Sequence, residues 1–511
     1  MCRNNPEDTG EFLNENEKNF ILPGNYYLFF TGFSYAQKED NVWYFGRTGA
    51  GLDFSECEPT VLTNGAQSQA FEGAASICDK STGQILFYTD GPFIYNANHV
   101  QMTGGPAALW NTVTQNTIIQ KPGSSSIYYL ISPEAQAACG ITNLLYPKGI
   151  NYAVIDMTLN SGLGGIVSAH NALIDSANCE KITALRNSNG QDIWLIGHRY
   201  NSNQFIVFNV TSAGINTVPS YYAVGPTIYT HQNNTAGISC FDAIGELKAS
   251  PSGTKLAFTT FYNGYTAIFD FDNSTGIISN AIAINLGGWG GYGVSFSPNS
   301  SKLYIGCIDT SQIMGNGYNG RLFQFDISSG DSAAIQNSQT LIYNSPTNSY
   351  SSLKLGPNGK IYAALHTGSA SAFGSNYLGV INYPDSSGLA CQYVHQGLYL
   401  NGLSSTWGLN NIMERNNFCN DVNSITDHEE KEIRVSLSPN PASEELLLSL
   451  GNNVKSNTTL SIYNFLGAEI LTAPITNTQT NINIRSLPSG VYFINVKEEG
   501  KSLGIKKFVK M

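Results

Sequence analysis

A strand–turn–strand unit recurs along the middle of the chain, and it constrains the fold more than any other feature. Three copies are clear: ASPSGTKLAFTT from Ala249, FSPNSSKLYIGC from Phe296 and LGPNGKIYAALH from Leu355. In each copy, Pro, Gly, Asn and Ser supply the backbone angles of a tight turn, and an apolar strand follows the turn. The pattern predicts antiparallel hairpins. Weaker copies begin at Ser76, Ile118 and Ala184.

A third apolar run follows each hairpin, as in YTAIFDFD and RLFQFDI, and a weaker fourth strand follows several of them. Units of four short strands that recur about every 40–65 residues are typical of propeller blades. One blade cannot bury both of its faces, whereas radial stacking buries the apolar faces between neighbours. Such units fill the chain between Gln69 and Val394. The sequence therefore predicts an all-β fold.

A further unit can be assembled from the two ends of this region. The segment Thr406–Met413 would supply the innermost strand, and Val42–Gly46 with LDF and TVL would supply the others. Strands from both ends would fasten a ring, because opening it would expose the apolar surface of a blade. We therefore predict a seven-bladed β-propeller over residues 37–419. An open array of β-sandwiches is the alternative.

The C-terminal region differs from the rest of the chain in charge. Residues 434–511 carry 8 Lys or Arg and 5 Asp or Glu, whereas the remainder carries 18 basic and 32 acidic residues. Alternating strands separated by Asn, Pro and Gly turns predict a small β-sandwich here. The polar segment 420–433 is predicted to be a linker. The acidic body disfavours nucleic acid as a partner, because phosphates require a basic surface.

Residues 1–36 are predicted to be a signal peptide. The short apolar run NYYLFFTGFSYAQ ends in Ser34-Tyr35-Ala36, which is typical of a signal-peptidase site. The run is too short to anchor the chain in a bilayer, and no transmembrane span is predicted. The segment before it is acidic where a signal peptide is positively charged, which is consistent with a start codon assigned too early. An ordinary buried segment is the alternative.

Removal of residues 1–36 leaves an even number of cysteines, which in an exported chain permits disulfides. Cys139 and Cys179 both lie in connections on one predicted face of the propeller, so we predict a disulfide between them. The cysteines and histidines lack zinc-like spacing, and no structural metal site is predicted. No cofactor is expected, and a bound cation such as Ca²⁺ is left open.

Four motifs follow one another in residues 434–511, and together they resemble the type A C-terminal sorting domain of the Bacteroidetes type IX secretion system. The resemblance implies that the chain passes through the periplasm to the outer cell surface or the medium. It also implies two partners, the translocon and its sortase-like peptidase. An independent Ig-like binding module is the alternative. The motif positions are Pro439, Asn440, Pro441, Tyr463, Gly467, Leu487, Gly490, Tyr492, Lys506, Lys507 and Val509.

Residues 40–418 resemble the broad class of seven-bladed propellers that includes WD40-like and lactonase-like proteins. The resemblance rests on the SPxGxKLxx hairpin, which marks a blade and no particular function. The stretches WYFGRTGAGLDF, EGAASICD and ILFYTDG are similar to those of a group of secreted Bacteroidetes propellers.

Candidate functional residues gather at one predicted mouth of the propeller channel, because the first strand of each blade starts there and the second strand returns there. Carboxylates and histidines around such a rim suit cation binding or acid–base chemistry. Polar loops that are simply hydrated are the alternative. Trp289 and Tyr292, in WGGYG, offer a stacking platform for sugars. Catalytic candidates are Glu72, Glu180, Asp242, His198 and His366, and further rim residues are Asp90, Lys181 and Arg199.

The sequence leaves two functions open. Low charge with abundant Tyr and Asn suits contact surfaces, which favours a secreted binding or adhesion module for a glycan, protein or surface ligand. The alternative is a secreted hydrolase or lyase that acts on a polysaccharide or lactone through the rim carboxylates and His. Motifs of a serine nucleophile, a zinc protease or a phosphate loop do not occur in a usable context.

Overall fold

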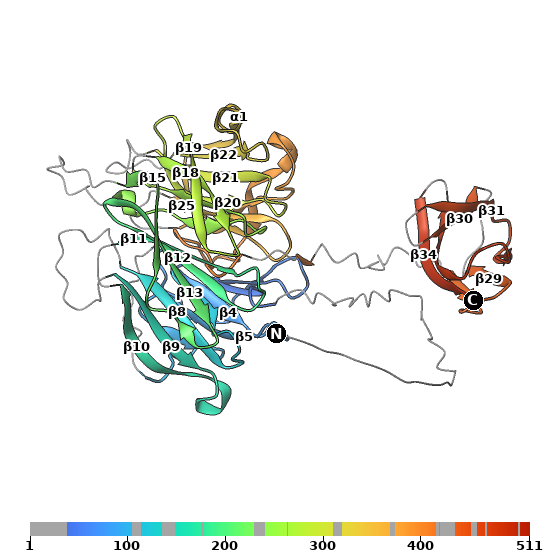
Figure 1. The fold of residues 1–511 in the computed structure, drawn as a ribbon, viewed down its shortest axis with the longest axis horizontal. Coiled ribbons are helices and arrows are strands. Elements are labelled where there is room, and N and C mark those ends of the chain that lie inside the picture. The colour runs from blue at the N-terminus through green and yellow to red at the C-terminus, as the bar shows by residue number, and fades with distance from the viewer. Residues whose placement is uncertain are drawn as a thin grey trace, which may run out of the picture. The chain divides into compact units, whose positions relative to one another are not determined.

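The computed structural model contains two compact units, Met1–Val422 and Asn423–Met511, and the division between them falls inside the predicted linker (Figure 1). The predicted signal peptide, the whole of that linker, Cys139 and Gly467 lie outside the described residues. The structure describes residues 38–104, 114–134, 149–174, 178–228, 241–262, 264–309, 319–367, 374–414, 418–419, 435–450, 457–464, 468–498 and 501–511.

Seven antiparallel sheets make up most of the described part of the first unit. The first two are β1 (Val42–Phe45), β2 (Ala50–Asp53) and β3 (Thr60–Leu62), then β4 (Ala75–Cys78), β5 (Ile85–Thr89) and β6 (Ile94–Asn96). The third is β7 (Thr117–Gln120), β8 (Ile127–Pro133), β9 (Ile150–Asp156) and β10 (Gly165–Ile174). The fourth is β11 (Asn178–Arg186), β12 (Ile193–Arg199), β13 (Ser202–Thr211), β14 (Gly214–Ile215) and β15 (Ser220–Ile228).

The remaining three sheets each have four strands in chain order. They are β16 (Leu247–Ala249), β17 (Lys255–Thr259), β18 (Tyr265–Asp272) and β19 (Ile277–Asn285), then β20 (Gly290–Phe296), β21 (Lys302–Ile308), β22 (Gly320–Asp326) and β23 (Thr340–Ser345), then β24 (Asn348–Leu355), β25 (Ile361–Thr367), β26 (Tyr377–Ile381) and β27 (Tyr393–Tyr399). The helical turns are η2 (Asn160–Gly162), η3 (Phe241–Ala243), α1 (Ser332–Asn337) and η5 (Gly388–Cys391).

The hairpins predicted from the repeats are confirmed. They are β4–β5, β7–β8, β11–β12, β16–β17, β20–β21 and β24–β25, all antiparallel. Two of their turns place Gly253 and Gly359 at φ of 69° and 75°, which lies in the left-handed region that glycine adopts readily. The turn residues of the repeat therefore supply the backbone angles that the pattern predicts.

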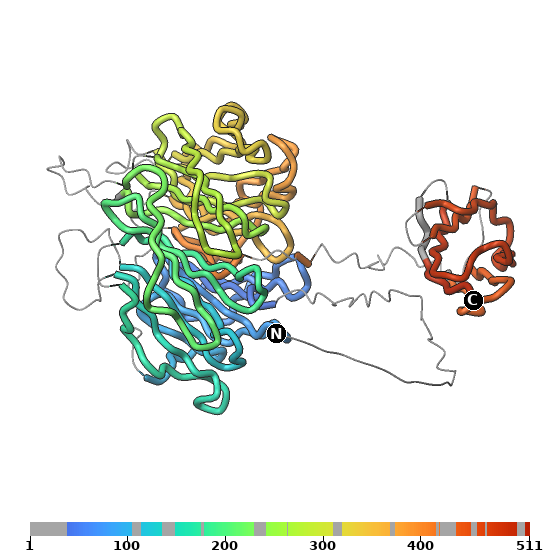
Figure 2. Tube along the Cα trace, viewed as in Figure 1, coloured from blue at the N-terminus to red at the C-terminus, as the bar shows by residue number. Residues whose placement is uncertain are grey.

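Each interface between neighbouring sheets contains an apolar cluster, and these clusters continue around a ring. Phe87 of β5 meets Tyr128 of β8 with ring centroids 5.6 Å apart. The ring closes where Trp43 of β1 meets Tyr362 of β25, at 5.7 Å. In Figure 2 the blue first strands accordingly lie beside the orange last strands of this unit. The first unit is therefore a β-propeller, as predicted.

The predicted strand exchange at the closure is wrong. In the part of the chain that the structure describes, the sheet of β1 has three strands, and Thr406–Met413 does not join it as a fourth. Amide groups of β1 are instead used by side chains of the second sheet. The Val42 amide donates to Cys78 Sγ at 3.3 Å, and the Tyr44 amide donates to Ser76 Oγ at 2.9 Å.

The closing segment, Thr406–Met413, lies among the innermost strands. The Trp407 amide donates to the Phe71 carbonyl at 3.1 Å, and the Asn411 amide donates to the Ala74 carbonyl at 3.0 Å. A Cβ on Gly408 would stand 1.5 Å from the Glu72 carbonyl oxygen, so this crossing requires glycine. The C-terminal end of the propeller thus fastens the ring by crossing its centre.

The predicted disulfide is also wrong. Cys179 is a free, buried thiol whose Sγ lies 3.9 Å from His198 Nδ1, and Cys139 lies outside the described residues. Burial raises the pKa of Cys179 to about 12. Among the described residues, a disulfide joins Cys57 to Cys419 across 362 residues of sequence, with their Cα atoms 5.7 Å apart. It fastens the two ends of the propeller to each other.

The second unit consists of two antiparallel sheets that share one core. One sheet is β28 (Val435–Ser438), β29 (Glu445–Leu450) and β32 (Gln479–Asn483). The other has the order β31 (Glu469–Pro474), β30 (Thr458–Asn464), β33 (Gly490–Glu498) and β34 (Lys501–Lys510). Leu446 and Leu448 of the first sheet are buried with Leu460 and Ile494 of the second. Alternating apolar residues of both sheets thus form the core of the predicted sandwich.

Candidate functional site

The propeller channel has two mouths, which the hairpins define. We call the end where the first strand of each hairpin begins the strand-entry mouth; the sequence places all the catalytic candidates there. We call the opposite end, where the turns β4–β5, β7–β8, β11–β12 and β16–β17 lie, the hairpin-turn mouth. The two ends differ in what their polar side chains contact.

Glu72 and Glu180 are brought together near the strand-entry mouth. Glu180 is fully buried, and its Oε2 accepts from the Thr114 amide at 2.9 Å and the Thr114 hydroxyl at 3.0 Å. Glu72 is 8% exposed, and its Oε2 has no hydrogen-bond partner among the described residues. Burial first, and the charge of Glu180 second, raise the pKa of Glu72 well above its ordinary value. The pair therefore retains a proton at a pH where an exposed glutamate has lost it.

The two candidate histidines are core residues rather than rim residues. His198, on β12, is fully buried, and its ring meets Phe205 edge-on at 4.8 Å. His366, on β25, lies with its ring centroid 4.3 Å from that of Trp407. Burial lowers the pKa of His198 to about 3 and that of His366 to about 4, so both imidazoles are neutral at pH 7.

Lys181 contacts Asp242 through the backbone carbonyl group of Asp242. The Lys181 ammonium is fully buried and donates to the carbonyl oxygens of Asp242, Ala243 and Ile244 at 3.3, 2.8 and 2.8 Å. Burial lowers the pKa of this lysine. The Asp242 side chain is buried as well. The cation thus holds the turn that leads into β16.

The predicted aromatic platform is wrong. Tyr292 is 1% exposed and packs against Phe261 and Trp407, with centroids 6.0 and 5.0 Å away. Trp289 is partly buried, and the Arg321 guanidinium lies 4.3 Å from the centroid of its ring. Neither ring is therefore a bare surface for a sugar.

The other two rim candidates support their own sheets. Asp90 is buried and accepts from the amides of Gln69 and Phe93 at 3.2 and 3.1 Å, and burial raises its pKa. The Arg199 guanidinium donates to Gln204 at 3.2 Å and lies 5.8 Å from the Tyr221 ring centroid. These contacts explain both residues without a ligand.

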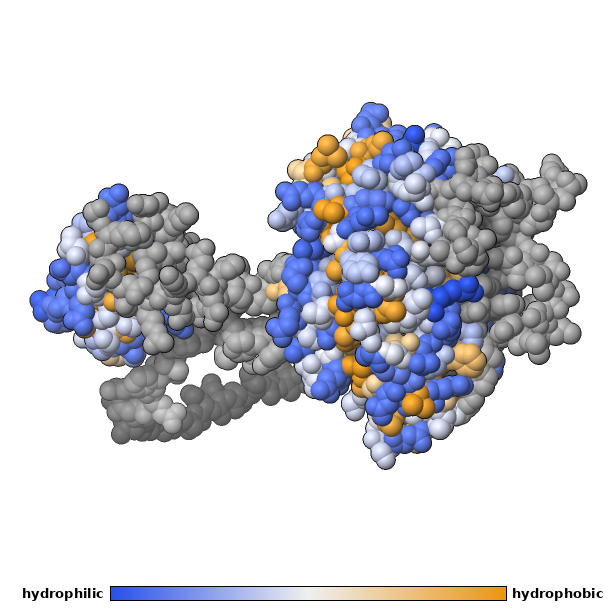
Figure 3. All heavy atoms as spheres, turned by 180° about the vertical axis from the view of Figure 1, so that it is seen from behind, coloured by the Kyte–Doolittle hydropathy of each residue, from blue (hydrophilic) through white to orange (hydrophobic). Residues whose placement is uncertain are grey.

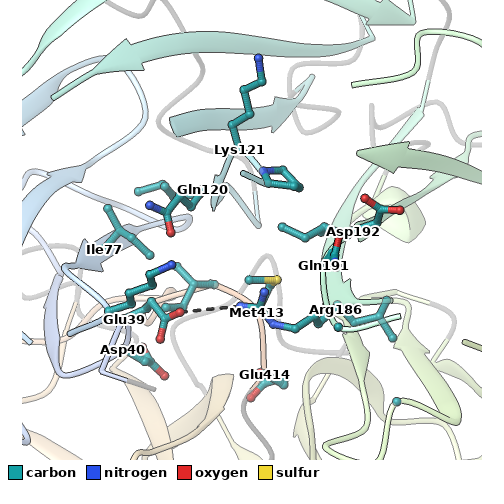
Figure 4. A pocket seen from close by; sticks show the side chains of 18 of the residues that line it. Glu39, Asp40, Ile77, Gln120, Lys121, Arg186, Gln191, Asp192, Met413 and Glu414 are labelled. Carbon is teal, nitrogen blue, oxygen red and sulfur yellow. Dashed lines mark ion pairs between the residues drawn. The ribbon is translucent and has the colours of Figure 1, made fainter. Parts of the chain in front are cut away.

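A cavity of about 590 Å³ opens at the opposite, hairpin-turn mouth (Figure 4). We call it the hairpin-turn cavity. Arg186 and Glu39 form an ion pair within its lining, with a nitrogen–oxygen distance of 3.7 Å, and Met413 of the closing segment lies beside them. Aliphatic lining comes from Ile77 and Ile118. The polar lining includes Gln120, Lys121, Ser124, Gln191, Asp192, Ser250 and Asn273.

A buried ion network adjoins this cavity, and two of its carboxylates, Asp40 and Glu414, line the cavity. Lys354 Nζ lies 3.5 Å from Asp40 Oδ2 and 3.2 Å from Glu414 Oε2. Lys248 Nζ lies 3.7 Å from Glu414 Oε1 and 3.8 Å from Glu246 Oε1. All five side chains are at least nine-tenths buried. The network links Glu414, which directly follows the closing segment, to Lys248 of β16 and Lys354 of β24.

The turns of the repeats are the sequence signal that points to this cavity, although the sequence places the candidate site at the other mouth. KPGSSS, NSNGQD and SPSG were predicted to be turns, and all three contribute to the lining. Asp40, Met413 and Glu414 come from the two ends of the propeller, which no single repeat brings together. Within the described ranges, no group of three or more His, Cys, Asp or Glu side chains is arranged to hold a metal ion.

Residues 436–511 match the model of one family, described as a secretion system C-terminal sorting domain. The chain is therefore exported by the type IX secretion system, to the cell surface or the medium, and its tail interacts with that system. Among the described residues, no helix has the length and apolar character needed to cross a membrane.

No curated protein matches the chain in sequence. A protein from Lactobacillus plantarum has a similar structure, with 12% identity and a TM-score of 0.41 over 73% of this chain and 99% of that one. The β-propeller domain of Cps50 (Swd1) from Myceliophteria thermophila has 10% identity and a TM-score of 0.36 over 65% and 95%. PorZ, a surface component of the type IX secretion system of Porphyromonas gingivalis, has 11% identity and a TM-score of 0.35 over 93% and 64%. Likenesses of this size carry no argument about activity.

Proposed function

We propose that the exported propeller is a binding module that takes a saccharide in the hairpin-turn cavity. The observation that carries the proposal is the cavity itself, whose volume of about 590 Å³ lies in the range of ligand sites. It is concave, and it lies at the opposite mouth from the buried candidate residues. A cavity of this shape can enclose a compact ligand, whereas a flat protein surface would not fill it.

The chemistry of the lining supports a polyhydroxylated ligand. The carboxamides of Gln120, Gln191 and Asn273 each offer a donor and an acceptor, as a sugar hydroxyl does. The aliphatic side chains of Ile77 and Met413 offer apolar contact to the C–H groups of a sugar ring. The face of the first unit that Figure 3 shows mixes hydrophilic and hydrophobic residues, and it presents no single extended apolar docking surface.

A glycan array probed with the full chain tests this proposal, with affinities of the hits measured by calorimetry. Gln191→Ala should weaken binding about tenfold, because one or two hydrogen bonds of about 1 kcal/mol are lost. Gln101→Ala is the matched control, since Gln101 is exposed and does not line the cavity. Equal affinities in both variants would place the ligand elsewhere.

A second candidate function is hydrolysis or elimination on a polysaccharide or lactone. The observation in its favour is the Glu72–Glu180 pair, in which one carboxyl is kept protonated beside another carboxylate. A substrate panel tests it. If the chain turns over a substrate and Glu180→Gln abolishes that turnover, catalysis replaces binding as the function. Ligand binding without turnover supports the binding module.

A further inference from the structure

The terminal strand of the sorting domain is an edge strand. β34 pairs with β33 from Gly490–Lys510 through Glu498–Lys501, and it is the last strand in its sheet. An edge strand presents backbone amide and carbonyl groups that no neighbouring strand of the sheet uses. Something must therefore complete its far edge, or the edge is open to a partner.

A segment about seventy residues earlier completes that edge near the C-terminus. The Asn440 carboxamide donates to the Lys507 carbonyl at 3.0 Å and accepts from the Val509 amide at 2.9 Å. The Ala442 amide donates to the Val509 carbonyl, and the Met511 amide donates to the Ala442 carbonyl, both at 2.9 Å. A side-chain amide here takes the place of a peptide group, because it has the same donor and acceptor.

The opposite edge of the terminal strand is equally well defined. Tyr492 lies opposite Phe508, with ring centroids 5.5 Å apart and rings inclined by 22°. Phe508 is fully buried, whereas Lys506 and Lys507 are exposed. The end of β34 is thus held by β33 on one side and by Asn440 and Ala442 on the other, with the lysines directed to solvent.

We propose that the secretion apparatus binds one composite surface, formed by Pro439–Ala442 together with Lys506–Met511, and that Asn440 is its positioning residue. Asn440 fixes the backbone of the terminal strand, and the edge of the fixed strand carries Lys506 and Lys507, whose side chains leave opposite faces of the strand, for contact with the partner. The Pro-Asn-Pro motif and the terminal lysines, far apart in sequence, are then two halves of one signal. This inference is independent of what the propeller binds.

Export of the full chain in a host with a type IX secretion system, together with hydrogen exchange of the purified full chain, tests the proposal. Asn440→Ala should lower the exported fraction about tenfold and speed exchange at residues 507–511. Asn481→Ala is the matched control, since Asn481 is an exposed asparagine on β32 of the other sheet. It should change neither measurement.

Asn440→Asp gives a readout that a merely space-filling role would not move. A protonated carboxyl group both donates and accepts, as the carboxamide does, whereas a carboxylate only accepts. Exchange at residues 507–511, relative to the unaltered chain at the same pH, should therefore approach normal in acid and rise above about pH 4. Normal export of Asn440→Ala would overturn the proposal. So would lost export with unchanged exchange of the terminal strand.

Discussion

The two mouths of the propeller channel carry similar residue types, and they use them differently. At the strand-entry mouth, Glu180, Lys181 and His198 are buried, and they contact backbone groups and neighbouring side chains. At the hairpin-turn mouth, the charges of Asp40 and Glu414 adjoin a cavity. The difference teaches that a polar residue at the end of a strand is a candidate for ligand binding only where it adjoins a cavity.

The largest expected effect tests whether the buried ion network is structural. Lys354→Met removes the cation between Asp40 and Glu414, and an uncompensated buried charge costs about 3–5 kcal/mol of stability. Chemical denaturation followed by tryptophan fluorescence measures it, because all 5 Trp lie in the first unit. Lys255→Met is the control. Its pair with Asp270 is more exposed, so the loss should stay below about 1 kcal/mol.

The disulfide should give the next largest effect. Replacing both Cys57 and Cys419 by Ser should lower the free energy of unfolding of the propeller by about 2–4 kcal/mol, the typical contribution of a disulfide that constrains the unfolded chain. The same fluorescence measurement with and without reductant checks this. A reductant that destabilises the double variant as much as the unaltered chain would contradict the assigned pairing.

The buried histidine of the strand-entry mouth should make stability depend on pH. The folded state keeps His198 neutral down to a pKa of about 3, whereas the unfolded chain takes up a proton below about 6.5. Stability should therefore fall as the pH drops below about 6.5, by up to about 1.4 kcal/mol per pH unit for this group. Denaturation midpoints between pH 7 and 5 measure the slope. His198→Asn should have a shallower slope, and an unchanged slope would show that the ring is solvated.

The smallest effect on stability is expected at the rim of the hairpin-turn cavity. Arg186→Gln breaks the pair with Glu39, whose atoms are 3.7 Å apart, and Arg186 is 38% exposed. Such pairs contribute about 0–1 kcal/mol, so the midpoint of unfolding should barely move. Saccharide affinity should change more than stability does. A large loss of stability would place Arg186 with the buried ion network instead of the cavity.

The sequence predicts the fold well because its signals are local. The turn between β16 and β17 and the turn between β24 and β25 each contain the residues that their backbone needs, and apolar strands flank both. The site is less predictable because it depends on how deeply each polar side chain is buried. Glu39 lines the cavity together with Met413 and Glu414 from the other end of the propeller, and Cys57 and Cys419 are separated by 362 residues. No repeat unit encodes such distant contacts.

Mapping where a bound saccharide protects the full chain from hydrogen exchange is the most direct test of the account. The ligand is the strongest hit from the glycan array, at saturating concentration. We expect protection at the turns that contain Lys121 and Gln191, which line the hairpin-turn cavity. Protection confined to the segments around Glu72 and Glu180, with the turns unchanged, would contradict the account and return the site to the strand-entry mouth.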